Sequence, residues 1–387
     1  MKTTFESLGV SAALSSALAE GGITSPFAIQ ALTIADALAG HDVCGKAKTG
    51  SGKTLAFGIP TLQMIPKAEP NKPTGIVLVP TRELATQVRD ELKPLGAAVD
   101  RTVVAIYGGD PIDKQVKLLE AGVDLMVCTP GRAIDLIDRK ALSVANVTNV
   151  IVDEADRMAD MGFLPQVEWI LRQVEGDHQT LLFSATLDGV VDSLVQRYQN
   201  DPKLHEVESS TVTVDQMHHR FLKVHEMDRV KVAATIINAS NKTMIFMNTK
   251  RDADRLVVKL QGEGVAVGAI HGDLRQNIRE KMLAQFTDGT LKALVATDVA
   301  ARGIHVDDVD VVIHYDLPID HKTYLHRSGR TARAGTSGVV VSFVLWNQEL
   351  EVKRLQKRIG LNVPIVEVFS NNPILKDLAA WDPSASA

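Results

Sequence analysis

The alternation of apolar and amphipathic stretches predicts a parallel α/β protein. Amphipathic segments with the apolar spacing of a helix occupy 83–92, 113–120 and 163–174. Short apolar runs separate them, at 75–79, 102–107, 124–128, 149–152 and 180–183. Such runs are typical of strands that are buried on both faces of a parallel sheet. In a sheet of this kind, ligands bind at the carboxyl ends of the strands.

A second alternation begins at Met217 and predicts a second α/β domain. Its expected strands are 220–224, 243–247, 266–270, 293–296, 309–314 and 339–345, and its expected helices are 252–260, 275–286 and 349–359. The small polar stretch Ser209-Ser210-Thr211-Val212-Thr213 has little to bury and is typical of a linker. We therefore predict an N-terminal domain at 1–208, a linker at 209–216, a second domain at 217–365 and a short tail at 366–387.

A glycine-rich segment, Ala47-Lys48-Thr49-Gly50-Ser51-Gly52-Lys53-Thr54, joins the apolar run Val43-Cys44 to a helical stretch at 55–65. A strand, a glycine-rich turn and a helix start together form a phosphate-binding loop, although Ala47 replaces the usual first glycine. The glycines let backbone N–H groups point at phosphate oxygens. Lys53 can reach the β and γ phosphates, and the Thr54 hydroxyl can bind Mg²⁺. We assign Thr49, Gly50, Ser51, Gly52, Lys53 and Thr54 to a nucleotide site.

Two carboxylates follow the predicted strand at 149–152, in Asp153-Glu154-Ala155-Asp156. On the sheet that carries the phosphate loop, Asp153 is the expected second ligand of Mg²⁺. Glu154 could then orient or deprotonate the attacking water. An acidic helix N-cap is the alternative interpretation, and Asp156 could supply that cap by itself.

Composition narrows the choice of partners and location. The net charge of −5 means that any nucleic-acid site depends on local basic groups, and 4% aromatic residues argue against a base-stacking platform. The two cysteines, Cys44 and Cys128, lie in apolar runs and indicate buried thiols rather than a disulfide framework or a zinc site. No signal peptide and no membrane-spanning run is evident, so we expect a cytoplasmic protein without a membrane partner.

The phosphate loop and the Asp-Glu-Ala-Asp tetrapeptide together make the chain resemble the DEAD-box RNA helicases. Three further stretches follow predicted strands as in that family: Pro80-Thr81-Arg82-Glu83-Leu84-Ala85, Gly108-Gly109 and Thr129-Pro130-Gly131-Arg132. The resemblance implies that these stretches hold the RNA backbone, and they offer hydroxyls, helix-start N–H groups and arginines that suit phosphate. Taken singly, each could be an ordinary turn with an N-cap. The expected RNA-binding residues here are Thr81, Arg82, Gly108, Gly109, Thr129, Gly131 and Arg132.

The resemblance also assigns an adenine-reading element upstream of the phosphate loop. Gln30 has a donor and an acceptor in one planar amide, which suits the edge of adenine, and Phe5 stands where the family places an aromatic near the base. The chain departs from the family at Phe27-Ala28, where Thr-Pro is usual. A buried Gln that caps a helix is the alternative interpretation of Gln30.

In the second half, Arg330 and Arg333 are three residues apart, which would place both on one helical face where they can reach the γ-phosphate. A solvated basic helix is the alternative interpretation. The stretch 296–304 matches a further helicase motif, in which Thr297 meets RNA phosphate and Gly303 approaches the nucleotide. His305 follows where the family usually has Asp for the ribose hydroxyls. Arg279 is an expected additional phosphate contact.

The resemblance further implies residues that couple the ATP state to RNA binding, namely Asp156, Ser184, Thr186, His326 and Arg327. It spans nearly the whole chain and implies two RecA-like domains, each a mostly parallel sheet flanked by helices. We expect a monomeric ATP-dependent RNA helicase that uses ATP and Mg²⁺ and binds single-stranded or duplex RNA with little sequence preference. No basic, Gly/Arg-rich or zinc-binding extension follows Gly360, which predicts a bare helicase core. An RNA clamp with weak unwinding and a DNA helicase of the same superfamily are the alternatives.

Overall fold

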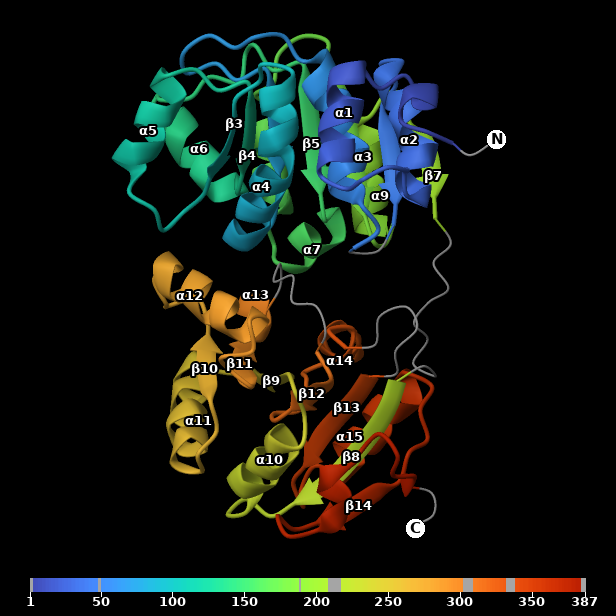
Figure 1. Cartoon of the computed structure of the whole chain (residues 1–387), viewed down its shortest axis with the longest axis vertical. Helices are drawn as coiled ribbons and strands as arrows, with labels where there is room; N and C mark the ends of the chain where they lie inside the picture. The colour runs from blue at the N-terminus through green and yellow to red at the C-terminus, as the bar shows by residue number, and fades with distance from the viewer. Residues whose placement is uncertain are drawn as a thin grey trace. The chain divides into compact units, whose positions relative to one another are not determined.

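The computed structural model describes residues 3–47, 50–187, 189–207, 217–301, 309–331 and 338–383. The chain divides into two compact units, Met1–Ser209 and Ser210–Ala387 (Figure 1). The predicted linker at 209–216 lies outside the described residues.

The first unit contains a seven-stranded, fully parallel sheet in the order β3-β4-β2-β5-β6-β1-β7. Its strands are β1 (Val43–Lys46), β2 (Gly75–Leu78), β3 (Val103–Ile106), β4 (Leu125–Cys128), β5 (Asn149–Asp153), β6 (Gln179–Ser184) and β7 (Lys203–Glu206). Every residue of β2, β4, β5 and β6 is buried, whereas the edge strand β7 is not. The continuous apolar runs of the sequence are therefore the interior strands.

Helices cover both faces of this sheet (Figure 1). They are α1 (Ala12–Glu20), α2 (Ala28–Leu38), α3 (Lys53–Met64), α4 (Arg82–Ala98), α5 (Ile112–Glu120), α6 (Pro130–Asp138), α7 (Ala155–Asp160), α8 (Leu164–Leu171) and α9 (Gly189–Tyr198), after a 3₁₀ turn at Glu6–Leu8. Successive residues of β2 point to opposite faces, so Val77 packs in one core with α1 to α4. Ile76 and Leu78 pack in a second core with α6, α8 and α9.

The second unit repeats this topology. Its parallel sheet has the order β10-β11-β9-β12-β13-β8-β14, which is the first order with seven added to each strand number. The strands are β8 (Met217–Val224), β9 (Thr243–Met247), β10 (Val267–Ile270), β11 (Ala293–Thr297), β12 (Val311–His314), β13 (Gly338–Val344) and β14 (Ile365–Val368). The helices are α10 (Arg229–Asn238), α11 (Lys250–Gly262), α12 (Gln276–Thr287), α13 (Asp298–Ala301), α14 (His321–Ser328) and α15 (Glu349–Arg358). The prediction of two parallel α/β sheets flanked by helices is confirmed.

The segment after 365, expected as a tail, contributes to the second unit. β14 pairs with β8, and a 3₁₀ turn at Pro373–Lys376 follows. Leu375 and Leu378 are buried in the core beneath α10 and α11. The buried Arg220 donates from Nε to the Leu378 carbonyl oxygen at 2.9 Å, and its guanidinium carbon lies 5.6 Å from the centre of the Trp381 ring. The end of the described chain thus supplies both apolar packing and hydrogen-bond acceptors.

We predict that Leu375→Ala destabilises the second unit by about 2–5 kcal/mol, because the cavity left by a fully buried leucine fills only partly. Urea unfolding followed by circular dichroism measures the change. The neighbouring exposed residue supplies the control, since Lys376→Ala removes a side chain of similar length without opening a cavity. Equal stability of the two variants would show that the segment is a dispensable tail.

Candidate active site

The carboxyl ends of β1, β5 and β6 lie side by side, because β6 pairs with β5 on one side and with β1 on the other. The phosphate loop leaves β1 and ends where α3 begins at Lys53. Gly50 and Gly52 have φ angles of +82° and +84°, which side chains other than glycine rarely adopt. The predicted contact Thr49 lies outside the described residues, whereas Ser51 and Thr54 are described.

Lys53 is held over its own loop. It is buried, and its Nζ donates to the Ala47 carbonyl oxygen at 3.0 Å. Ala47 therefore fills the usual glycine position without displacing the lysine. The positive charge lies at the N-terminus of a twelve-residue helix, where unpaired backbone N–H groups also favour anions.

Asp153 and Glu154 are both almost fully buried at the end of β5. Asp153 Oδ1 accepts a hydrogen bond from the Glu154 backbone N–H at 2.9 Å. Burial raises the pKa of the Asp153 carboxyl, the nearby charge of Lys53 opposes that shift, and the charge of Glu154 adds to it. A buried carboxylate that is incompletely neutralised is a place where a cation is stabilised.

Glu154 stands at φ +54° and immediately precedes α7. Its carboxylate forms an ion pair with Arg157, one turn further along that helix. Arg157 was not among the predicted site residues, although its position three residues after Glu154 is a helical spacing that could have suggested it. The pair fixes the orientation of the carboxylate that we expected to face water.

The oxygen donors near the phosphate loop fit Mg²⁺. The ion prefers carboxylate and hydroxyl oxygens and keeps several water ligands, so it needs only one or two protein groups. Asp153 supplies a buried carboxylate. Burial raises the pKa of the nearby Glu91 carboxyl and the Thr54 hydroxyl lowers it, and the same hydroxyl oxygen has lone pairs that can accept a cation. Among the described residues there is no ready cluster of three or more His, Cys, Asp or Glu side chains around one point.

Gln30 connects the start of α2 to the phosphate loop. Its Oε1 accepts from the Phe27 backbone N–H at 2.9 Å, and its Nε2 donates to the Gly52 carbonyl oxygen at 2.9 Å. The amide therefore caps the helix and also contacts the loop, so the two interpretations of this residue are compatible. Phe5 is 3% exposed and packs in the core with Val10 and Leu14.

Asp156 joins β5 to β6 at this edge. Its backbone N–H donates to Ser184 Oγ at 3.2 Å, and its Oδ2 accepts from the backbone N–H of Thr186, also at 3.2 Å. Ser184, the last residue of β6, is fully buried. The structure thus brings together the three first-unit residues that were expected to couple ATP and RNA binding.

The expected RNA-binding residues of the first unit follow β2, β3 and β4, which are neighbours in the sheet. Thr81 is the N-cap of α4, and its Oγ1 accepts from the Leu84 N–H at 3.3 Å. Arg82 lies against Gly109, where any side chain would collide with the guanidinium. Gly109 therefore leaves room for the Arg82 guanidinium, whereas a Cβ atom at Gly108 would meet nothing within 4 Å.

Arg132 extends this surface from the first turn of α6. Its Nη1 donates to Gln115 Oε1 at 2.7 Å, and both terminal nitrogens contact the Asp110 carbonyl oxygen at 3.2 Å. Gln115 in turn donates to the Tyr107 carbonyl oxygen at 2.9 Å. The Thr129 backbone N–H donates to the Ile106 carbonyl oxygen at 3.2 Å, which ties the start of this helix to the end of β3, and Gly131 lies in the first turn beside the arginine. Gln115 carries no motif signal, and it was not predicted.

In the second unit, Arg327 joins three of the helicase-like segments. It is 1% exposed, and its Nε and Nη2 donate to the two carboxylate oxygens of Asp298 at 2.6 and 2.7 Å. Nη2 also donates to Asn248 Oδ1 at 2.9 Å, and Nη1 to the Asp316 carbonyl oxygen at 2.7 Å. Arg327 is therefore committed inside its own unit, whereas His326 on the same helix is exposed. Asp298 and Asn248 were not among the predicted site residues.

We expected Arg330 and Arg333 to share one face of a helix, and this expectation is wrong because Arg330 does not lie in a helix. α14 ends at Ser328 because Gly329 caps it, and Arg330 follows in a turn. Arg333, Gly303 and His305 lie outside the described residues. Arg279, on α12, and Thr297, at the end of β11, are both buried at the edge where β10, β11 and β9 end.

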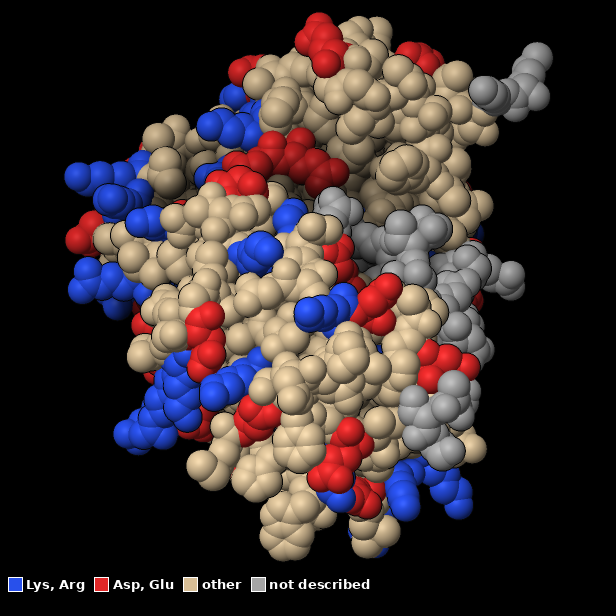
Figure 2. Space-filling view, turned by 60° about the horizontal axis from the view of Figure 1, so that its bottom comes forward, with Lys and Arg blue, Asp and Glu red and all other residues tan. Residues whose placement is uncertain are grey.

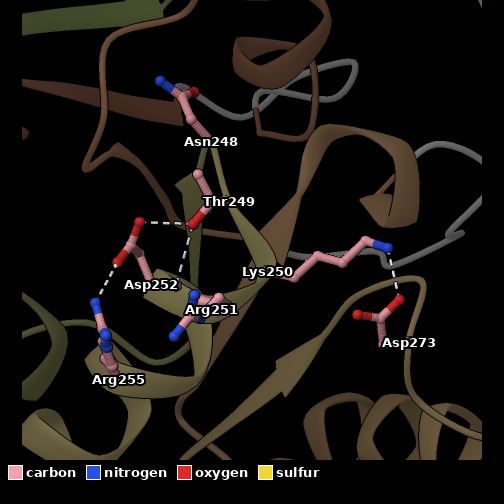
Figure 3. A pocket seen from close by; sticks show the side chains of 7 residues that line it. All are labelled: Asn248, Thr249, Lys250, Arg251, Asp252, Arg255 and Asp273. Atoms are coloured by element: carbon pink, nitrogen blue, oxygen red, sulfur yellow. Dashed lines mark hydrogen bonds and ion pairs between the residues drawn. The ribbon is translucent and has the colours of Figure 1, made fainter.

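A polar pocket of about 540 Å³ opens at this edge of the second unit, around the start of α11 (Figure 3). Its lining residues are Asn248, Thr249, Lys250, Arg251, Asp252, Arg255 and Asp273. Lys250 contacts Asp273 at 2.6 Å and Arg255 contacts Asp252 at 3.3 Å, both as exposed ion pairs. Arg251 and Arg255 are spaced i, i+4 and bring basic groups that the motifs did not identify.

The chain carries 42 Lys and Arg residues against 47 Asp and Glu residues, so any basic surface is local. Figure 2 shows Lys and Arg side chains interspersed with Asp and Glu side chains on the face in view. None of the described helices combines the length and apolar character needed to cross a bilayer.

Comparison with known proteins identifies the family. The DEAD/DEAH box helicase model matches residues 27–194, and the helicase conserved C-terminal domain model matches residues 223–335. The chain is 41% identical to the DEAD-box ATP-dependent RNA helicase CshA of Geobacillus kaustophilus, over 88% of this chain and 73% of that protein. It is 38% identical to the ATP-dependent RNA helicase RhlB of Xanthomonas oryzae, over 95% of this chain and 66% of that protein.

A solved structure agrees with these relatives. Dbp5 of S. cerevisiae bound to RNA and ADP BeF3 is 30% identical, with a TM-score of 0.79 over 97% of this chain and 99% of that one. The two sheets, the phosphate loop, the buried Asp153 and Glu154, and these likenesses lead to one conclusion. The chain belongs to the DEAD-box ATP-dependent RNA helicases.

Proposed function

We propose that this protein hydrolyses ATP to ADP and phosphate and uses the cycle to clamp single-stranded RNA and separate short RNA duplexes. The observation that carries the proposal is the division of one sheet edge into two neighbouring groups of strand ends. β1, β5 and β6 end in the phosphate-binding and acidic residues, and β2, β3 and β4 end in the hydroxyls, glycines and arginines suited to an RNA backbone. The cytoplasm, where ATP and RNA both occur, is the proposed location, and a monomer is the proposed state.

The placement of the described ATP-side residues supports the roles proposed for them. Backbone N–H groups at the start of α3 and the Lys53 ammonium bind the phosphates, and Gln30 reads the edge of the base. Glu154, oriented by Arg157, holds the attacking water and accepts its proton. Mg²⁺, held by Thr54 and Asp153, would neutralise charge on the β- and γ-phosphate oxygens. Arg330 and Arg333 are proposed to stabilise charge on the γ-phosphate, and Gly303 and His305 to contact the nucleotide.

The RNA-side residues occupy equivalent places in both units. β3, β4 and β2 of the first unit correspond in sheet order to β10, β11 and β9 of the second. Arg82 and Arg132 follow the first group, and Thr297, Arg279 and the pocket around α11 follow the second. Contacts of this kind go to phosphate and sugar, so they position RNA without reading its sequence.

Coupling between ATP and RNA rests on short polar links. Asp156, Ser184 and Thr186 tie the acidic strand end to β6, so a change at Glu154 reaches the neighbouring loop through hydrogen bonds of about 3 Å. In the second unit, Arg327 donates to Asp298, the residue after Thr297 at the end of β11. Arg327 comes three residues before Arg330 in the chain. This hydrogen bond therefore connects the segment of the proposed γ-phosphate arginines to the strand end proposed to bind RNA. His326 is the proposed exposed partner in this coupling.

We predict that single-stranded RNA raises the rate of ATP hydrolysis strongly, whereas DNA of the same sequence does not. Glu154→Gln should lower the RNA-stimulated rate by roughly 10²–10⁴-fold, because the base is lost, while ATP still binds. A steady-state phosphate-release assay with no nucleic acid, RNA or DNA measures this. Glu175→Gln, at an exposed acidic position of the same unit, is the control. Equal stimulation by DNA would favour a DNA helicase, and RNA binding without stimulation would favour a clamp.

We predict that Asp298→Asn destabilises the second unit by about 3–5 kcal/mol, because it leaves the buried Arg327 guanidinium without its counter-charge. RNA stimulation should be lost as well. Urea unfolding and the ATPase assay measure the two effects. Glu349→Gln breaks the more exposed pair with Lys223 and should cost less than about 1 kcal/mol. Comparable losses in both variants would contradict a special role for the buried pair.

We predict that the double variant Arg251→Ala, Arg255→Ala weakens RNA binding and lowers the slope of log affinity against log salt by about 1.4, at roughly 0.7 for each phosphate of a single strand that is no longer neutralised. Fluorescence anisotropy with labelled RNA at several salt concentrations gives the slope. Arg354→Ala, Arg358→Ala removes an equally spaced exposed pair from α15 and serves as the control. An unchanged slope in the α11 variant would remove this pocket from the RNA surface.

A further inference from the structure

An exposed aromatic ring lies beside the phosphate loop, at the position where this chain departs from its family. Phe27 is 59% exposed, although its neighbours Ile29 and Gln30 are almost completely buried. It is the only aromatic among the large exposed hydrophobic side chains of the first unit's described residues. Exposing a phenyl ring to water is unfavourable, so a ring kept at a binding site suggests a ligand that covers it.

The backbone of Gly52 shows how closely the ring approaches the loop. A Cβ atom added to Gly52 would lie 2.7 Å from Cδ2 of Phe27 and would also collide with the Gln30 amide. The Phe27 side chain and the Gln30 amide therefore both lie against the last glycine of the phosphate loop. The absence of a side chain at Gly52 is what allows that approach.

The hydrogen bonds of Gln30 leave part of its amide for a ligand. One N–H of Nε2 goes to the Gly52 carbonyl oxygen and one lone pair of Oε1 goes to the Phe27 N–H. One N–H and one lone pair remain, which match the donor and acceptor on the edge of a purine. An amide in the base plane contacts only the edge of the base, so the face of the base needs a different partner.

The aromatic residue expected to lie near the base is not free to offer its face. Phe5 is 3% exposed and its ring packs within the core formed by α1, α2 and α3. Phe27, in contrast, adjoins both the base-reading amide and the phosphate loop. The two aromatic positions therefore differ in what they offer a ligand: Phe5 is structural, and Phe27 presents open ring surface.

We propose that Phe27 stacks on the nucleobase of the bound nucleotide and supplies affinity that Gln30 alone does not. This inference rests on the proposed ATP-binding function. Every base has a π face, so stacking on Phe27 strengthens the binding of all nucleotides by a similar factor. Gln30 contacts the edge and therefore sets the preference for adenine. Affinity and selectivity are thus carried by two different side chains that touch the same glycine.

The test measures equilibrium binding of ADP, GDP and inorganic triphosphate to the full chain by isothermal titration calorimetry, without RNA. Phe27→Ala should weaken ADP and GDP by about tenfold each and leave triphosphate unchanged, since stacking involves only the base. Phe27→Trp should retain or exceed the original affinity. Gln30→Ala should instead reduce the ratio of ADP to GDP affinity. Leu118→Ala, at another exposed hydrophobic position of the first unit, is the matched control.

The possible results distinguish a failure of the stacking proposal from a failure of the proposed ATP-binding function. Unchanged ADP affinity in Phe27→Ala, with normal binding by the parent chain, would overturn stacking and leave the nucleotide site intact. An equal loss of ADP and triphosphate would also overturn it, because it would show that Phe27 supports the phosphate loop. A parent chain that binds none of the three ligands would instead contradict the nucleotide site itself.

Discussion

The pairing of β6 between β5 and β1 is the constraint on which the first unit's chemistry depends. It sets the phosphate loop and the Asp153-Glu154 pair at one edge, although about 100 residues separate them in the sequence. The proximity is electrostatic as well as geometric, because the charge of Lys53 acts on the Asp153 carboxyl. Any change that shifts the register of β6 against β5 would move Ser184 away from Asp156 and would separate the ATP side from its link to the neighbouring loop.

The second unit repeats the sheet topology of the first unit, but a different set of polar residues connects its loops. No phosphate loop occurs in its sequence, and its central polar element is the buried Arg327 with Asp298 and Asn248. A buried guanidinium is tolerated because its donors are matched by a carboxylate, an amide oxygen and a carbonyl oxygen. The same sheet order therefore supports two kinds of site: an anion-binding loop in one unit, and in the other a rigid polar connection between loops.

The sequence predicted the strands well because interior parallel strands are short apolar runs, and β9 has the expected bounds of 243–247. It did not predict α6, α9, α10 or α13, and it assigned all but the first residue of β14 to a tail. α6 begins within Thr129-Pro130-Gly131-Arg132, whose proline and glycine are typical of a turn, although proline is also favoured in the first turn of a helix. β14 is partly exposed and only four residues long, so its pattern carries little information.

Site residues could be predicted where they belong to a sequence motif. They could not be predicted where their role depends on a side-chain contact that only the tertiary structure creates. Lys53, Asp153 and Glu154 follow from local sequence. Gln115 contacts Arg132 from another helix, so its role depends on which helices lie next to each other. Arg157 contacts Glu154 three residues away on the same helical turn, a spacing that the sequence already contains. The position of Arg330 was misjudged because spacing was read as helix, whereas Gly329 ends α14 before it. Spacing fixes a face only where the helix is known to continue.

In the first sheet, the polar groups at the amino ends of the strands differ from those at the carboxyl ends in how completely the protein satisfies their hydrogen bonds. Before β1, the buried Asp42 accepts from the Thr180 and Asn200 N–H groups, both at 2.7 Å. Before β4, the buried Asp124 accepts from Ala68 and Thr102 at 2.6 and 2.7 Å. Backbone donors satisfy both carboxylates, and Asp124 also forms an ion pair with Lys67 at 3.5 Å. At the carboxyl edge, Asp153 accepts one hydrogen bond from a backbone N–H. Nearby, the Gln30 amide keeps one N–H and one lone pair for a further hydrogen bond. The two edges therefore differ in how many polar groups still lack a protein partner. That difference, rather than the number of polar residues, marks the carboxyl edge as the one built for a ligand.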